Sequence, residues 1–378
     1  MKLFSGRGGA ETMRGVRVFW QHSMEPVTHF LTGACLGRSG FNRKTAYATL
    51  AMTLAAEAPD IDMLWGIRGP VAQFQHHRGI THTFLGAPFM ALIVTGAVWL
   101  WDRWRTASGP GAEKQRSTPQ PVHWGWIWLL ALIADLSHIL LDWTNNYGVR
   151  PLFPFNPHWY YGSIFFLFEP VYFAALLTAL ILPAILGLAD REIGARKSRF
   201  RGRGWAIFAL TIGVLLGCWR WAEKQRALHL LAQVDLQGAA AIKSTVNPYP
   251  GNPFDWFGVV ETKGFYRTAF VNTYTGEIVS HSSSDTYYKQ PQTAAVRAAE
   301  GSWLGEVYMN WSQYPLVYSL GTDGSLQNRT TAIHFVDLRF AYNPLFLRPA
   351  SRVPLSGTVL VAPDGSIDEM RLNGHIQR

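Results

Sequence analysis

WGWIWLLALIADLSHILLD, residues 124–142, is the stretch that decides the fold class of this chain. It is long and apolar enough to cross a bilayer, which takes about 20 predominantly apolar residues. It also carries Asp135, His138 and Asp142. At about 3.6 residues per turn, these three positions lie in one narrow stripe of a helix. Ionisable groups in a membrane helix are costly unless they are paired or bind a metal, so the stripe indicates a functional site.

Other apolar stretches extend the membrane domain. Tryptophans stand near many of their ends, such as Trp101, Trp124 and Trp205, where amphipathic rings favour the headgroup region. Two stretches near the N-terminus, 27–37 and 45–58, are too short to span a bilayer. We therefore predict an all-α polytopic membrane domain with short N-terminal helices and about four spanning helices, at 84–101, 124–141, 170–189 and 205–221.

The sequence after residue 222 changes from long apolar runs to short β-prone ones, separated by turn signals such as Asp364-Gly365. The β-prone runs are 257–262, 265–271, 333–340 and 358–362, and residues 290–310 could supply a helix. We predict a basic, Gly-rich extension at 1–23, a membrane domain at 24–222 and a soluble α+β domain at 223–378. The pattern that opens at Met24 leaves open whether Met1 or Met24 is the natural start.

Basic residues set the expected orientation. Residues 102–123 and 190–203 are rich in Lys and Arg, whereas residues 143–162 hold only Arg150. The positive-inside rule therefore predicts a bacterial inner-membrane protein whose C-terminal domain is extracytoplasmic. The net charge of +9 lies mainly in such segments beside apolar helices, which argues against nucleic acid as a partner. Membrane lipids are the expected surroundings.

Two further clusters of metal-ligating residue types accompany the helical stripe. Asp60 and Asp62 follow a short apolar stretch, and His77, Arg78 and His82 precede the stretch 84–101. Carboxylates two apart cannot share a helical face, so one could bind a metal while the other orients a histidine. They could equally be loop residues that end a helix, and the histidines could be interfacial polar residues. Arg78 could hold a phosphate or carboxylate oxygen with two hydrogen bonds.

The predicted topology brings these clusters together. The end of the helix over 124–141 and the start of the helix over 84–101 both lie at the outer face. A hairpin at Arg38, Arg43 and Lys44 would return His29 and Asp60 to the same side. Oxygen and imidazole ligands at one depth suit a divalent metal, most simply Zn, with Mn and Fe as alternatives.

The sequence resembles the YdjM-like family of bacterial inner-membrane proteins, described as metal-dependent hydrolases. The resemblance covers roughly residues 24–190 and rests on four ordered motifs: Pro26-x-Thr28-His29, Pro59-Asp60-x-Asp62, His77-Arg78-Gly79-x-Thr81-His82 and Asp135-x-x-His138-x-x-x-Asp142. Thr83 stands where the family usually has serine, and Glu169-Pro170 where it has Asp-Pro. The resemblance implies hydrolysis but does not settle the substrate.

The expected function is metal-dependent hydrolysis of a phosphoester or ester in a lipid or envelope molecule. The expected metal ligands are His29, Asp60, His77, His82, Asp135, His138 and Asp142. Asp62 or Asp142 would act as a general base, and Arg78 would neutralise charge on the substrate. The alternatives are a divalent-metal carrier or sensor, and a membrane scaffold with a structural metal. The oligomeric state and the role of the C-terminal domain stay open.

Overall fold

The computed structural model describes residues 26–107, 120–192, 202–249, 251–322, 330–341 and 353–377. The predicted extension over 1–23 and both candidate starts, Met1 and Met24, lie outside these ranges. The chain divides into two compact units that alternate along the sequence. The first unit comprises residues up to 63 together with 80–157 and 167–214, and the second comprises 64–79, 158–166 and 215–378.

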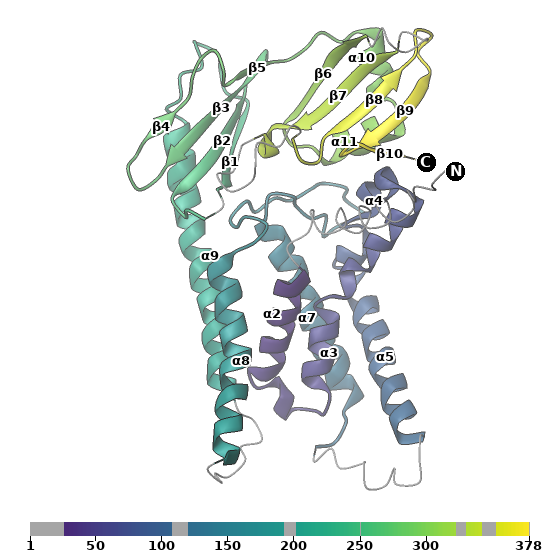
Figure 1. The fold of residues 1–378 in the computed structure, drawn as a ribbon, viewed down its shortest axis with the longest axis vertical. Helices are drawn as coiled ribbons and strands as arrows, with labels where there is room; N and C mark the ends of the chain where they lie inside the picture. Colours follow the sequence, from purple (N-terminus) through teal and green to yellow (C-terminus); the bar gives the residue numbers. More distant parts are fainter. Residues whose placement is uncertain are drawn as a thin grey trace, which may run out of the picture. The chain divides into compact units, whose positions relative to one another are not determined.

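The first unit is a bundle of helices, drawn in purple to teal in Figure 1. Two short helices open it, α2 (Pro26–Arg38) and α3 (Ala48–Ala55), separated by the 3-10 turn η1 (Phe41–Arg43). The longer helices are α5 (Ala87–Ala107), α7 (Trp124–Thr144), α8 (Pro170–Glu192) and the first half of α9 (Arg203–Leu231). Small residues dominate the buried core between α3, α5 and α7, including Ala51, Ala55, Ala91 and Ala131.

Close packing of α2 against α3 is made possible by two glycines one turn apart. A Cβ atom on Gly33 would come within 2.5 Å of the Met52 carbonyl oxygen, and one on Gly37 within 2.6 Å of the Thr49 Cα atom. Small residues four apart let helix backbones approach closely in membrane bundles. Because His29 lies four residues before Gly33, it shares this helical face. The sequence of α2 therefore turns His29 towards the helices that carry the other site residues.

Three helices are long and apolar enough to cross a membrane: Trp124–Thr144, Pro170–Leu188 and Arg203–Leu231. The segments Pro70–His82 and Ala87–Thr106 pass the same test only as a broken pair, so the described residues hold three or four candidate spans. The expected span over 84–101 therefore depends on this pair. The reason is local, since Asp102, Arg103 and Arg105 lie within the last turns of α5.

The second unit holds two antiparallel five-stranded sheets. The first sheet has the order β1 (Lys243–Pro248), β2 (Asp255–Glu261), β3 (Phe265–Asn272), β4 (Ile278–Val279), with β5 (Thr286–Tyr288) also paired to β3. The second has the order β10 (His375–Ile376), β9 (Ile367–Leu372), β8 (Gly357–Val361), β7 (Thr331–Asp337), β6 (Pro315–Thr322). Figure 1 shows them as two separate groups of arrows, green and yellow-green.

Helical segments complete the second unit. α10 (Ala294–Glu300) and α11 (Trp303–Trp311) begin at Thr293 and Ser302, whose side chains accept hydrogen bonds from backbone N–H groups of the first turn. The short helix α4 (Pro70–His76) belongs to the same unit, as does the 3-10 turn η4 (Leu338–Phe340) that follows β7. The 3-10 helix η2 (Ala58–Arg68) starts in the first unit and ends in the second.

The structure agrees with the expected elements of the C-terminal region and adds to them. The four β-prone runs correspond to β2, β3, β7 with η4, and β8, and the helical segment is two helices, α10 and α11. The strands β1, β4, β5, β6, β9 and β10 were not predicted. Several are short or lie at a sheet edge, where side-chain alternation is weak as a sequence signal.

Candidate metal centre

The polar stripe of α7 is fully buried. Asp135, His138 and Asp142 each have 0% exposure, whereas Leu136 and Leu140 on the same helix are exposed. The helix therefore turns its ionisable residues into the bundle and its leucines outwards, as a membrane helix should.

Three other elements of the first unit bring side chains to this stripe. His29 comes from the first turn of α2, Asp60 and Asp62 come from η2, and His82 ends the 3-10 turn η3 (Ile80–His82). Thr83 closes the turn that leads into α5, since its Oγ1 accepts a hydrogen bond from the Gly86 N–H at 2.8 Å. The threonine in place of the usual serine thus supplies the same hydroxyl.

Four donor atoms converge around His82 and His138. The Nε2 atoms of these histidines lie 3.1 Å apart. The Asp60 Oδ1 atom lies 3.4 Å from His82 Nε2 and 3.7 Å from His138 Nε2, and Asp142 Oδ2 lies 3.5 Å from both. Donor atoms on a tetrahedron with bonds of 2.0–2.1 Å are about 3.3 Å apart. Five of the six separations among these atoms are 3.1–3.7 Å, close to that value.

The second nitrogen of each histidine fixes its orientation. His138 Nδ1 lies 2.7 Å from the Ala56 carbonyl oxygen, which can only accept, so Nδ1 carries the proton. His82 Nδ1 lies 3.0 Å from Asp62 Oδ2, and the Thr81 hydroxyl donates to the same oxygen at 3.2 Å. In the neutral tautomers both Nε2 atoms then present lone pairs to the same point. Metal-binding histidines are commonly held in this way by a carbonyl or carboxylate.

Several buried polar atoms of the cluster have no hydrogen-bond partner among the described residues, which also favours a bound cation. Both ring nitrogens of His29 and both carboxylate oxygens of Asp60 are buried with no hydrogen-bond partner in the described part of the chain. Two nitrogens 3.1 Å apart beside two carboxylates need a proton or a cation between them, because two lone pairs at that distance repel one another. The residues therefore fit a divalent cation. The donor atoms of Asp60, His82 and His138 lie within 4.8 Å of one another, as do those of His29, His138 and Asp142.

The electrostatics of the metal-free cluster are dominated by burial and by close charges. Burial alone would raise the pKa of Asp60, but His138 and His82 outweigh it and lower that pKa to about 2. Burial and the Asp60 carboxylate raise the pKa of Glu57 to about 7. Glu57 Oε1 is buried with no hydrogen-bond partner among the described residues, and Glu57 was not singled out in the sequence. Its place two residues before Pro59-Asp60 was the signal that could have found it.

The remaining predicted residues lie differently. Asp135 is buried and its oxygens have no hydrogen-bond partner among the described residues, but it belongs to none of the groups that could hold an ion. His77 and Arg78 are buried in the second unit, where Arg78 has a positive φ of 51° and the Gly79 N–H bonds to the His76 carbonyl oxygen. Roles for Asp135, His77 and Arg78 stay predictions.

Apolar spanning helices and a buried His/Asp cluster at the ends of four elements define a class: an integral membrane protein with a site that could hold a metal ion. The family model for the YdjM inner membrane protein matches residues 24–227, which is more than half of the chain. The chain therefore belongs to the YdjM inner membrane protein family, as the resemblance predicted.

One relative is similar over part of its length. The chain is 27% identical over 167 residues to the uncharacterized protein YfhP of Bacillus subtilis (strain 168), covering 42% of this chain and 46% of that protein. The match thus spans under half of the relative. No solved structure matches the chain.

Proposed function

We propose that this protein is a membrane-bound, metal-dependent hydrolase acting on an ester or phosphoester bond of a lipid or other envelope molecule. The observation that carries the proposal is a set of four donor atoms, from Asp60, His82, His138 and Asp142, in which five of the six pairs are 3.1–3.7 Å apart. Zinc fits this set of nitrogen and oxygen donors, and Mn or Fe would also fit.

The residues around the site have distinct roles in this proposal. When bound, the ion supplies Lewis-acid chemistry, lowering the pKa of a coordinated water and polarising the scissile bond. Asp62 and the Ala56 carbonyl hold His82 and His138 with their Nε2 atoms facing the ion. Asp62 is the candidate general base, because its carboxylate contacts His82 without being one of the four donors. Arg78 remains the candidate group for neutralising charge on the substrate.

A lipid substrate is supported by the 3-10 helix that carries Asp60. Beyond its carboxylates, η2 leaves Leu64 61% and Ile67 85% exposed, three residues apart and hence on one side of a 3-10 helix. The Arg68 guanidinium lies 4.8 Å from the centre of the Trp65 ring. Exposed leucine and isoleucine beside Trp and Arg are typical of a segment that lies in a membrane interface. The 3-10 helix η2, which carries Asp60, would then also contact lipid headgroups.

The extracytoplasmic position of the C-terminal region is part of this proposal and rests on the basic segments 102–123 and 190–203. A periplasmic phosphatase fused after residue 230 should be active in cells. If only a fusion to a reporter enzyme that works in the cytoplasm were active, the predicted orientation would be reversed.

The activity test uses the full-length protein in nanodiscs, depleted of metal with a chelator and reloaded with Zn²⁺ or Mn²⁺. We expect hydrolysis of at least one phospholipid or lipid ester in a panel analysed by mass spectrometry. His138→Ala and Asp142→Ala should abolish this activity, whereas Asp368→Asn, an exposed carboxylate in the second unit, should not change it. Absence of stoichiometric metal after every loading would overturn the metal site. Bound metal without turnover would favour a carrier or a scaffold.

A further inference from the structure

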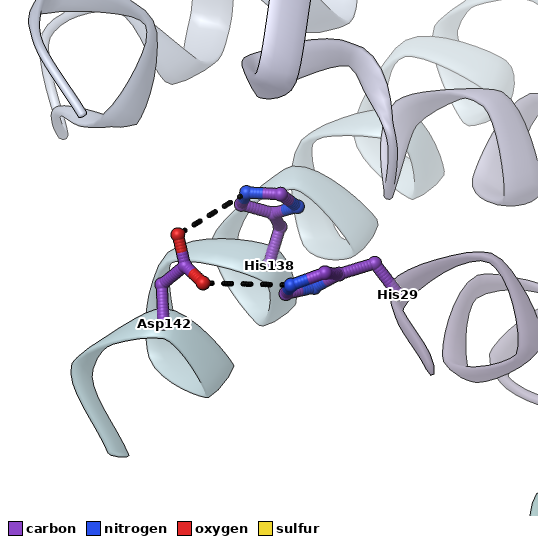
Figure 2. A group of neighbouring side chains, drawn as sticks. All are labelled: His29, His138 and Asp142. Carbon is purple, nitrogen blue, oxygen red and sulfur yellow. Dashed lines mark ion pairs between the residues drawn. The ribbon is translucent and has the colours of Figure 1, made fainter. Parts of the chain in front are cut away.

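The carboxylate of Asp142 faces two different histidines. Figure 2 shows one of its oxygens directed to His138 and the other to His29. The separations are 3.5 Å from Oδ2 to His138 Nε2 and 3.4 Å from Oδ1 to His29 Nε2. A carboxylate that presents one oxygen to each of two nitrogens has the arrangement of a bridging ligand.

His29 is not one of the four donors from Asp60, His82, His138 and Asp142. It is fully buried, and neither ring nitrogen has a hydrogen-bond partner in the part of the chain that the structure describes. His138 cannot serve it as a shared ligand, because Nδ1 donates to the Ala56 carbonyl and Nε2 faces His82 and Asp60. His29 Nε2 approaches Asp142 Oδ1 at 3.4 Å, which does not meet hydrogen-bond geometry, and an imidazole buried in this way is costly unless a ligand satisfies one of its nitrogens.

The stacking of the His29 and His138 rings indicates the distance between two ions that these histidines could bind. The rings are stacked with centroids 3.9 Å apart and planes 27° from parallel. Two nearly parallel imidazoles that each bind their own ion place those ions about one ring separation apart. Catalytic sites with two metal ions have them about 3.5–4 Å apart. The stacking distance therefore fits two ions better than one.

We propose that the centre holds a second divalent cation, bound by His29 Nε2 and by Oδ1 of a bridging Asp142. This inference rests on the proposed metal centre and deepens it. Two protein donors leave most of the coordination positions of the second ion open, so it binds more weakly than the ion in the four-donor set. The open positions suit phosphate oxygens, because paired ions stabilise the attacking and leaving oxygens of a phosphoryl displacement. The substrate class is thus a phosphoester rather than a carboxylic ester.

The test measures metal rather than activity. Full-length protein in detergent is stripped with a chelator and titrated with Mn²⁺, while bound metal is followed by mass spectrometry and electron paramagnetic resonance. We expect one tight and one weak equivalent, with an exchange-coupled spectrum when both are bound. His29→Ala and the bulkier His29→Gln should keep the tight equivalent, lose the weak one and show the spectrum of an isolated ion. His123→Ala, a histidine outside the cluster, should behave as the unaltered protein.

The outcomes separate the two proposals. Saturation at a single, uncoupled equivalent in the unaltered protein would overturn the second ion and leave the hydrolase proposal standing. Retention of both equivalents in His29→Ala, or loss of both in the two His29 variants, would also overturn it. Binding of no metal at all would instead remove the metal centre itself.

Inorganic phosphate tests the substrate class. The Mn²⁺-loaded protein should bind phosphate about tenfold more tightly than Mn²⁺-loaded His29→Ala, which corresponds to about 1.4 kcal/mol. Equal affinities would overturn the assignment to phosphoesters.

Discussion

The metal cluster of the first unit and the buried ion pair of the second are both polar groups inside a protein, yet they are completed in different ways. In the second unit, Arg339 donates to Asp337 through Nη2 at 2.7 Å and through Nε at 3.0 Å. The Ser312 hydroxyl and the Gln313 N–H bond to the same carboxylate, at 2.7 and 2.8 Å. The guanidinium also lies 4.2 Å from the centre of the Tyr161 ring. This pair needs nothing from outside.

The cluster in the first unit is not complete in this sense. Its histidines present lone pairs to carboxylates, and His29 and Asp60 keep buried atoms with no hydrogen-bond partner among the described residues. The comparison shows how a structural polar group differs from a binding site. The structural group pairs every charge within the chain, whereas the site holds surplus donor atoms in fixed positions and leaves the compensating charge to a ligand.

The largest expected effect comes from breaking the complete pair. Asp337→Asn leaves the Arg339 guanidinium buried without its carboxylate, and such a loss costs about 3–5 kcal/mol. Hydrogen exchange of the full-length protein, followed by mass spectrometry on peptides from 303–322, should show a matching loss of protection. Metal binding should stay as in the unaltered protein, because the cluster belongs to the other unit.

The controls for this prediction are one exposed and one paired substitution. Asp368→Asn, in the same sheet but exposed, should leave protection unchanged. The double variant Asp337→Leu with Arg339→Met should recover part of the loss, because an apolar replacement of both partners leaves no buried charge. Full protection in Asp337→Asn would mean that the aromatic rings and water alone satisfy Arg339.

A smaller effect is expected at the edge of the incomplete cluster. Asp62→Asn keeps the size of the side chain but removes the carboxylate that accepts the His82 Nδ1–H. Loss of such an outer partner lowers metal affinity about 10–100-fold. Competition with a fluorescent zinc chelator measures this directly, with Asp337→Asn as the matched carboxylate substitution that should not affect zinc. An unchanged zinc affinity in Asp62→Asn would show that a neutral amide oxygen at position 62 orients His82 as well as the carboxylate does.

The sequence predicts that the three ionisable residues of α7 share one face of the helix, but not which of them could bind a metal ion. Period alone places Asp135, His138 and Asp142 on one face, and all three are buried. It cannot tell that Asp142 falls within a group that could hold an ion while Asp135 does not, because this depends on where α2 places His29.

Other features of the site leave no trace in the sequence pattern. The acceptor that fixes the His138 tautomer is the Ala56 carbonyl, and every residue has a backbone carbonyl. The assignment of 64–79 to the second unit also depends on tertiary contacts. Gln75 accepts a hydrogen bond from the Trp303 indole, and the Val71 N–H donates to the Gln377 side chain, in both cases with a partner far along the chain. By contrast, the expected spans at 124–141 and 170–189 needed only a long apolar run.

The smallest expected effect is the acid response of the complete pair. Burial alone would raise the pKa of Asp337, but Arg339 and the Ser312 hydroxyl outweigh it and hold that pKa below its usual value. A carboxyl group whose pKa is lower in the folded than in the unfolded state stabilises the fold above its unfolded pKa of about 3.9. This contribution declines as the pH falls below that value towards the folded pKa, and each unit of difference corresponds to about 1.4 kcal/mol.

Protection in peptides from 303–322 should therefore stay constant from pH 7 to about pH 5, once corrected for the intrinsic exchange rate, and decline below about pH 4. In Asp337→Asn the titrating group is absent, so the part of the acid response due to this pair should disappear while the lower protection at neutral pH remains. An identical acid profile in both proteins would assign acid sensitivity to other carboxylates. The ion pair would then matter for folding at every pH without sensing pH itself, which is the behaviour of a charge fully compensated within the chain.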